Sequence, residues 1–177
     1  MVKNCGIRIK SLFLQTMVRT KYFLFLSFAI VCFSACKKSE NIEVADPSIQ
    51  FSADTTAIRA FVKANNIPAI KDSYGVFYQI IEPGSGSVMY NSTTRITSDY
   101  EGRLLNGNIF DSSKGTPITF ALGGVIAGWQ IGIQRIQQGG KIRLIIPSYY
   151  GYGTQAVGGI PANSPLDFTI SLTQVSN

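Results

Sequence analysis

From residue 74 onward the apolar residues alternate as they do in β-strands, except over one stretch where they recur at helical spacing. We expect strands at residues 74–82, 93–105, 108–112, 141–146 and 166–175. The helical stretch carries Val125, Ile126, Trp129, Ile133 and Ile136, and Gly139-Gly140 ends it. Strands, one helix and further strands, in that order, predict an α+β fold with an antiparallel sheet, and not a parallel βαβ arrangement.

A shorter helical pattern precedes these segments. Its expected N-cap is Ser52, its apolar face carries Ala57, Ile58, Phe61 and Val62, and its end is marked by Asn65, Asn66 and Pro68. We assign residues 51–72 to this segment, which either packs on the main domain or serves a partner. Residues 36–50 are polar and contain Pro47, so we expect a flexible tether there.

The beginning of the chain resembles a bacterial secretory signal. Tyr22 to Ala35 is a charge-free run of 14 residues after Arg19 and Lys21, whereas a membrane-spanning helix needs about 20 apolar residues. Small residues precede Cys36, which predicts a lipoprotein signal peptide over residues 1–35 and a lipid on Cys36. A plain signal peptide or membrane anchor is the alternative. Met17 also makes an ordinary signal start, so residues 1–16 could lie outside the translated protein.

Composition excludes several function classes. The formal charge is +6, but five of the 16 basic residues and none of the ten acidic residues precede Cys36. The remaining charges nearly balance, which argues against a nucleic-acid partner. Cys36 is the sole cysteine left after signal removal, so a disulfide framework is excluded. The chain has no His, which removes catalytic triads that need one and the commonest zinc ligand.

Several segments are similar, in order and spacing, to the FKBP family of peptidyl-prolyl isomerases. They lie at residues 100–107, 109–113, 125–132, 146–153 and 160–166, with the strand around Phe168 closing the match. The resemblance covers about residues 74–176. It implies a twisted antiparallel sheet wrapped around one short helix, in an isomerase domain spanning residues 73–177 after the short N-terminal helix.

The resemblance also implies a shallow apolar pocket. Its catalytic groups would be the side chains of Tyr100, Asp111 and Tyr152. Substrate-binding residues carried over by motif are Phe110, Phe120, Val125, Ile126, Trp129, Ile160 and Phe168. Trp129 would form the floor, and the backbone N–H of Ile126 would donate to a substrate carbonyl. Without the motif, Trp129 would be an ordinary core residue and Asp111 an ordinary turn residue.

Such residue types suit the isomerisation of an X-Pro bond. Rotation about the amide crosses a barrier of about 20 kcal/mol because it destroys resonance, and no nucleophile is required. A catalyst needs an apolar slot for the proline ring and groups that favour the twisted amide. We therefore expect neither a cofactor nor a metal.

Two functions stay open at this stage. The favoured one is a foldase for proline-containing unfolded or nascent envelope polypeptides, lipid-anchored at the periplasmic face or outer membrane. The other is a chaperone or assembly module that uses the same fold with little turnover. The resemblance also makes macrolide inhibitors of the family candidate ligands. The loop after Ser113 is short, so the arginine that many relatives place near Asp111 has no clear counterpart, and Lys114 is at best a substitute for it.

Overall fold

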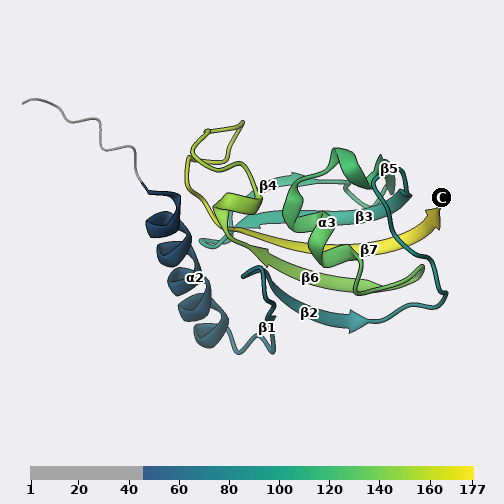
Figure 1. The fold of residues 1–177 in the computed structure, drawn as a ribbon, viewed down its shortest axis with the longest axis horizontal. Coiled ribbons are helices and arrows are strands. Elements are labelled where there is room, and N and C mark those ends of the chain that lie inside the picture. Colours follow the sequence, from purple (N-terminus) through teal and green to yellow (C-terminus); the bar gives the residue numbers. More distant parts are fainter. Residues whose placement is uncertain (1–45) are drawn as a thin grey trace, which may run out of the picture. The chain divides into compact units, whose positions relative to one another are not determined.

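The computed structural model describes residues 46–177. An antiparallel sheet with strand order β1-β2-β6-β7-β3-β4 dominates this part, and β5 pairs separately with β3 (Figure 1). The strands are β1 (Ile70–Lys71), β2 (Phe77–Glu82), β3 (Arg95–Leu104), β4 (Ile109–Ser112), β5 (Ile118–Ala121), β6 (Lys141–Ile146) and β7 (Leu166–Ser176). The helices are α2 (Pro47–Ala64) and α3 (Ala127–Ile133), with short 3-10 turns η1 (Leu122–Gly124) and η2 (Ser148–Tyr150). The α+β prediction is confirmed.

The long central strands β3, β7 and β6 pair with one another in a defined register. β3 pairs with β7 from Arg95 opposite Ser176 to Leu104 opposite Leu166, with one irregularity after Thr97. β6 adds to the other side of β7, and Ile142 there lies opposite Ile170. The alternating apolar residues of these strands consequently face the same side of the sheet.

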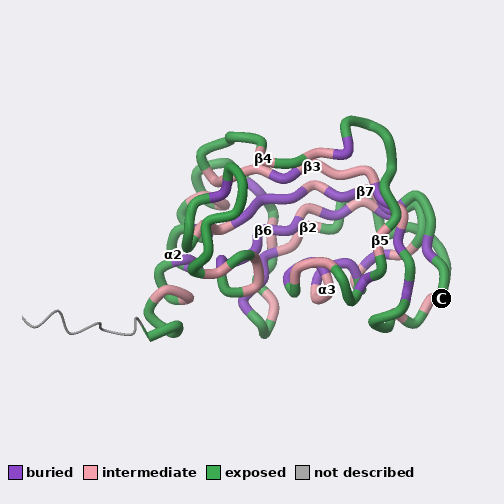
Figure 2. Tube along the Cα trace, turned by 90° about the horizontal axis from the view of Figure 1, so that it is seen from above, coloured by how far each residue is buried: buried purple, intermediate pink, exposed green. Residues whose placement is uncertain are grey.

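The main core lies between that side of the sheet and α3. Figure 2 shows buried residues along β6, β7 and α3. Gly128 and Gly132 lie one helical turn apart on α3 and face the side chains of Ile146 and Leu144 on β6. Because neither glycine has a Cβ, α3 lies close against the sheet. This close approach places Trp129 against the centre of the sheet.

A second, smaller core lies where α2 packs on the opposite side. It contains Ile58, Ile67, Phe77 and Ile145, all buried. Arg143 forms two hydrogen bonds to Asp167, at 2.8 and 2.6 Å, beside this core. The upstream helix therefore packs on the main domain, which is one of the two roles considered for it.

The start of α2 differs from the sequence prediction. The helix begins at Pro47, and its N-cap is Asp46, whose side chain accepts the backbone N–H of Ser48 at 2.9 Å. Ser52 is therefore inside the helix and is not the N-cap. Pro47 is suited to the first helical turn because its missing N–H has no partner there in any helix. Residues 47–50 thus belong to the helix and not to the expected tether.

The end of α3 also differs. The helix ends at Ile133, whereas the apolar spacing predicted that it would continue to Gly139. Beyond Ile133 the chain bonds to the segment after β2: the Tyr90 hydroxyl donates to the Ile136 carbonyl, and Gln137 N–H donates to the Pro83 carbonyl. These long-range bonds replace the helical ones.

The predicted signal peptide, the predicted lipidation at Cys36 and residues 36–45 of the expected tether lie outside the described residues. Within residues 46–177, no helix is long and apolar enough to cross a membrane.

Candidate functional site

A cavity of about 260 Å³ opens between α3 and the strands β3, β4 and β5. We call it the Trp129 pocket. It is lined by Tyr100, Asp111, Phe120, Gly124, Val125, Ile126, Trp129, Tyr152 and Phe168. Eight of the ten residues predicted for the pocket are among them. Residues from four strands, a helix and a loop, spread over nearly 70 positions of the sequence, therefore meet in one place.

Trp129 forms the floor of this pocket and is almost fully buried. Three aromatic rings stand nearly perpendicular to its indole, with centroids 5.3 Å away for Tyr100, 6.0 Å for Phe120 and 5.3 Å for Phe168. Edge-to-face contacts of this kind are favourable and hold rings in fixed orientations. The walls of the pocket are therefore apolar and rigid.

The polar rim is built around Asp111. Its Oδ2 accepts a hydrogen bond from the Tyr100 hydroxyl at 2.8 Å, and its Oδ1 accepts the backbone N–H of Ser112 at 2.8 Å. Burial, followed by the hydrogen bond to Asp111, raises the pKa of the Tyr100 phenol to about 12. Tyr100 thus stays a neutral hydrogen-bond donor at physiological pH.

Tyr152 completes the rim from the loop that follows η2. Its side chain is 37% exposed. Burial raises the pKa of its phenol, and the charge of Asp111 adds to the effect. The loop is tied down because Gly153 N–H donates to the Ser148 carbonyl and Asn163 N–H donates to the Gly153 carbonyl, both at 2.8 Å.

Two donors near the floor have no protein partner. The backbone N–H of Ile126 donates no hydrogen bond to any described residue. The buried Nε1 of Trp129 likewise lacks a partner within residues 46–177. The carbonyl of Val125, by contrast, accepts the Gln130 side chain at 2.8 Å, which holds the turn before α3. The Ile126 N–H lies on a residue that lines the pocket, which fits the role implied for it.

Phe110 and Ile160 do not line the pocket. Phe110 packs edge to face on Phe168, with ring centroids 5.4 Å apart, and covers Gly102. Ile160 is buried in the main core. Neither residue is among those that line the cavity, and their predicted contact with substrate stays a prediction. Gly124 is the lining residue that the motifs missed, since a glycine offers no side-chain signal.

Lys114 does not take the place of an arginine beside Asp111. It lines a separate hollow together with Asp99 and Glu101. Its backbone is left-handed, with φ of 55°, in the turn after β4. Among residues 46–177, no group of three His, Cys, Asp or Glu side chains is placed to hold a metal ion.

A sheet wrapped around one short helix, with an aromatic pocket between them, is the arrangement expected for FKBP-type isomerases. The family model described as FKBP-type peptidyl-prolyl cis-trans isomerase matches residues 86–173. A solved peptidyl-prolyl cis-trans isomerase from Pseudomonas syringae is 35% identical, with a TM-score of 0.61, and the match covers 71% of this chain and 96% of that one. The chain belongs to the FKBP-type peptidyl-prolyl cis-trans isomerase family.

Among individual proteins, the chain is similar to FkpA. FkpA of Buchnera aphidicola subsp. Schizaphis graminum is 47% identical over 109 residues, which cover 60% of this chain and 43% of that protein. FkpA of Escherichia coli K12 is 44% identical over 105 residues, 58% of this chain and 38% of that protein. The crystal structure of E. coli FkpA matches with a TM-score of 0.64 at 29% identity, covering 99% of this chain and 75% of that chain. The chain spans less than half the length of these curated relatives.

Proposed function

We propose that the chain is a peptidyl-prolyl cis-trans isomerase that acts on X-Pro bonds in the Trp129 pocket. The observation that carries this proposal is the pocket itself: a rigid aromatic box with the hydrogen-bonded Tyr100–Asp111 pair on its rim. Family membership supports the same activity.

The mechanism needs no covalent intermediate. The proline ring would lie on Trp129 between the rings of Phe120 and Phe168, while the amide carbonyl outside it accepts the Ile126 N–H. As the amide twists, it loses resonance, so the distribution of charge over its nitrogen and its carbonyl oxygen changes. Asp111 and the phenols of Tyr100 and Tyr152 are placed to interact with the twisted bond more strongly than with the planar one. That difference lowers the barrier.

Proline-limited refolding of a model protein tests the proposal. We expect the wild-type chain, at catalytic concentrations, to accelerate the slow phase, which takes tens of seconds without catalyst. A chain that prevents aggregation but leaves the slow phase unchanged would contradict isomerase activity and favour the chaperone alternative.

We also propose that the protein is anchored in the cell envelope by a lipid on Cys36. The support is the short apolar run that ends at this cysteine. Its clients would then be unfolded or nascent envelope polypeptides that contain proline. We expect Cys36→Ser to abolish lipidation and to move the protein from the membrane fraction to the soluble fraction. If Cys36→Ser stays fully membrane-bound, or if the wild type has an unmodified N-terminus, the anchor proposal is wrong.

Macrolide inhibitors are proposed as ligands of the same pocket. The chain is 47% identical over 85 residues to FK506-binding protein 4 of Saccharomyces cerevisiae, although this covers only 22% of that protein. The absence of a basic residue beside Asp111 among the lining residues of the Trp129 pocket changes its rim, so we expect weak binding.

A further inference from the structure

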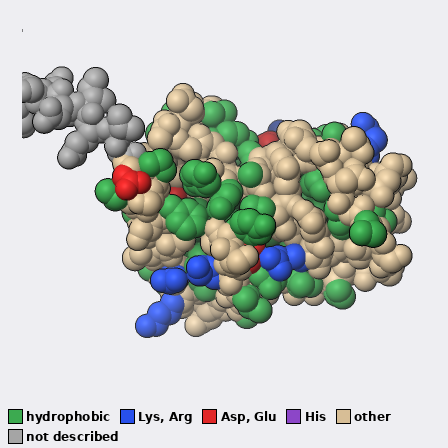
Figure 3. Space-filling view, in the orientation of Figure 1, with side chains coloured by type: hydrophobic (Ala, Val, Ile, Leu, Met, Phe, Trp, Pro, Cys, Tyr) green, Lys and Arg blue, Asp and Glu red, His purple; other side chains and the backbone are tan. Residues whose placement is uncertain are grey.

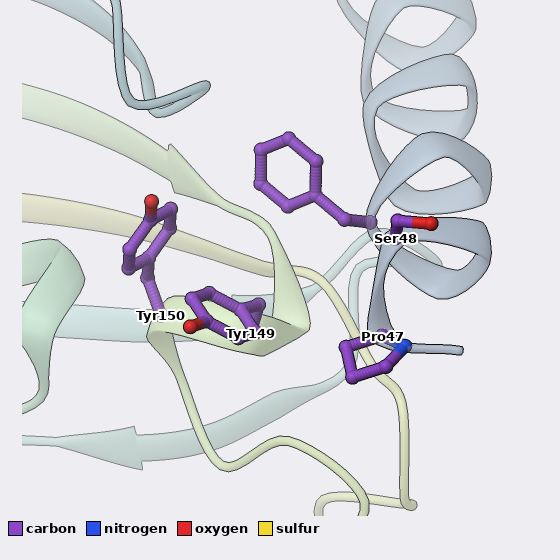
Figure 4. Close-up of a pocket in the computed structure, with 5 residues that line it drawn as sticks. Pro47, Ser48, Tyr149 and Tyr150 are labelled. Carbon is purple, nitrogen blue, oxygen red and sulfur yellow. The ribbon is translucent and has the colours of Figure 1, made fainter. Parts of the chain in front are cut away.

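A second hollow, of about 280 Å³, lies where α2 meets η2. Its walls come from the first turns of α2 and from two consecutive tyrosines of η2 (Figure 4). The lining residues are Pro47, Ser48, Phe51, Tyr149 and Tyr150. We call it the tyrosine groove. None of its lining side chains is charged at neutral pH, so it is unsuited to a phosphate or a metal ion.

The aromatic rings of the groove hold one another in place. Phe51 stands nearly perpendicular to Tyr149 and to Tyr150, with ring centroids 6.3 and 6.1 Å apart. The two tyrosine rings are also perpendicular, at 4.9 Å. Tyr149 is nevertheless 62% exposed. A fixed aromatic wall that is open to solvent loses little conformational entropy when a ligand covers it.

A buried carboxylate fixes the two walls relative to each other. Asp54 of α2 is 2% exposed, and its Oδ2 accepts both the backbone N–H and the hydroxyl of Ser148, at 2.7 and 2.6 Å. The Gln50 side chain donates to its Oδ1 at 2.6 Å. The groove is therefore a preformed feature of the fold.

A short stretch of chain connects the groove to the Trp129 pocket. Tyr149 and Tyr150 line the groove, and Tyr152, two residues later, lines the pocket. Three residues span at most about 10 Å, so an extended polypeptide held at Tyr152 can reach Tyr149 with its neighbouring residues. Figure 3 shows hydrophobic side chains gathered between α2 and the middle of the molecule on this face.

We propose that the tyrosine groove binds a second, extended stretch of the polypeptide whose prolyl bond lies over Trp129. This inference rests on the proposed isomerase function. The ligand class is an uncharged segment rich in proline and apolar residues, because extended proline-containing segments dock in aromatic-lined grooves and use tyrosine hydroxyls for their free carbonyls. The groove thereby gives the enzyme a preference for long substrates over short ones.

Steady-state isomerisation of two peptides by the full chain tests this proposal. One is a tetrapeptide with a Leu-Pro bond, and the other is a peptide of about 20 residues with the same bond flanked by proline and leucine, long enough to reach both sites. We expect Tyr149→Ala to raise KM for the long peptide about fivefold. The loss of kcat/KM for the tetrapeptide should be clearly smaller, because that peptide does not reach the groove.

A second variant separates binding from local folding. Ser48→Glu places a negative charge in the groove but lies in the first turn of α2, where acidic side chains stabilise a helix. Like Tyr149→Ala, this variant should impair isomerisation of the long peptide more than that of the tetrapeptide. It should do so without loss of thermal stability. Met89→Ala is the control, because Met89 is an 85% exposed apolar residue that lines neither site. It should leave both peptides unaffected.

The outcomes distinguish this proposal from the isomerase proposal. If the wild-type chain isomerises neither peptide, the proposed function fails. If it isomerises both, but Tyr149→Ala and Ser48→Glu leave the ratio of the two kcat/KM values unchanged, the groove is not a substrate site and this inference is overturned.

Discussion

Asp111 is the residue at which a structural role and a catalytic role can be separated. Its carboxylate accepts the Tyr100 hydroxyl and the Ser112 N–H on the rim of the pocket, but it is exposed and outside both cores. We expect Asp111→Ala to lower kcat/KM for X-Pro isomerisation about tenfold, equivalent to about 1.4 kcal/mol of transition-state stabilisation. Proline-limited refolding measures the rate, and circular dichroism checks the fold.

Glu82→Ala is the matched control for that measurement. Glu82 is also an exposed carboxylate, but it ends β2 and does not line the pocket. It should keep wild-type kcat/KM. Equal activity of the wild type and Asp111→Ala would show that Asp111 is only a turn residue.

The Tyr100 phenol makes the stability of the protein depend on pH in the alkaline range. Its pKa is about 12 in the folded protein, raised by burial and by Asp111 from the usual value of 10. A raised folded-state pKa contributes stability that is present below pH 10 and is lost as the pH rises toward 12. We expect Tyr100→Phe to flatten the fall in Tm between pH 10 and 12, measured by thermal denaturation followed by circular dichroism. An identical fall in both proteins would contradict the assignment.

At the scale of elements, the contact between α3 and β6 sets the depth of the pocket floor. A Cβ at Gly128 would approach the Ile146 side chain more closely than van der Waals contact allows. We expect Gly128→Ala to destabilise the protein by about 1–3 kcal/mol through overpacking, and to lower activity because Trp129 follows directly. Chemical denaturation measures the loss.

Gly159→Ala is the control for this prediction. A Cβ at Gly159 meets no atom within 4 Å, and its φ is not in the left-handed region. Its stability should stay within about 0.5 kcal/mol of wild type, as for ordinary surface changes. A Gly128→Ala chain as stable as this control would show that α3 can shift away from the sheet at no cost.

The elements that were predicted well are those whose local pattern agrees with their tertiary contacts. β7 alternates from Leu166 to Leu172 because one side packs on the main core, and Asn106-Gly107 sets the turn between β3 and β4. The end of α3 was not predictable from spacing, because Ile136 keeps the helical interval but its carbonyl is bonded to Tyr90. Long-range hydrogen bonds of this kind cannot be recognised from the spacing of apolar residues along the chain.

The candidate site shows the same limit. Motif order predicted which residues gather around Trp129, but not which of them face the cavity. A Cβ on Gly102 would meet the rings of both Phe110 and Phe168, and the register of β3 with β4 shifts immediately after this glycine. Phe168 lines the cavity and Phe110 is not among its lining residues. Irregularities of register cannot be read from a single sequence.

At the scale of the whole molecule, one sheet serves two cores of unequal size. The core between α3 and the sheet holds the pocket, and the smaller core lies under α2. The tyrosine groove lies between α2 and η2, and Tyr150 of η2 also packs against the larger core. The two cores share β6, whose Leu144 faces α3 and whose Ile145 faces α2. A change under α2 can therefore reach the pocket through β6 and through the loop that carries Tyr152.

Shortening the chain to residues 71–177 tests whether the larger core folds without α2. The shortened chain loses Ile58 and Ile67, whose burial contributes about 1.5–3 kcal/mol each, and leaves Ser148 without its Asp54 acceptor. Because small domains have about 5–15 kcal/mol of stability, we expect it to unfold cooperatively but at a lower denaturant midpoint than the full chain. Ile58→Ala in the full chain should account for about 2–5 kcal/mol of that loss. A shortened chain without a cooperative transition would show instead that α2 belongs to the minimal folding unit of the isomerase domain.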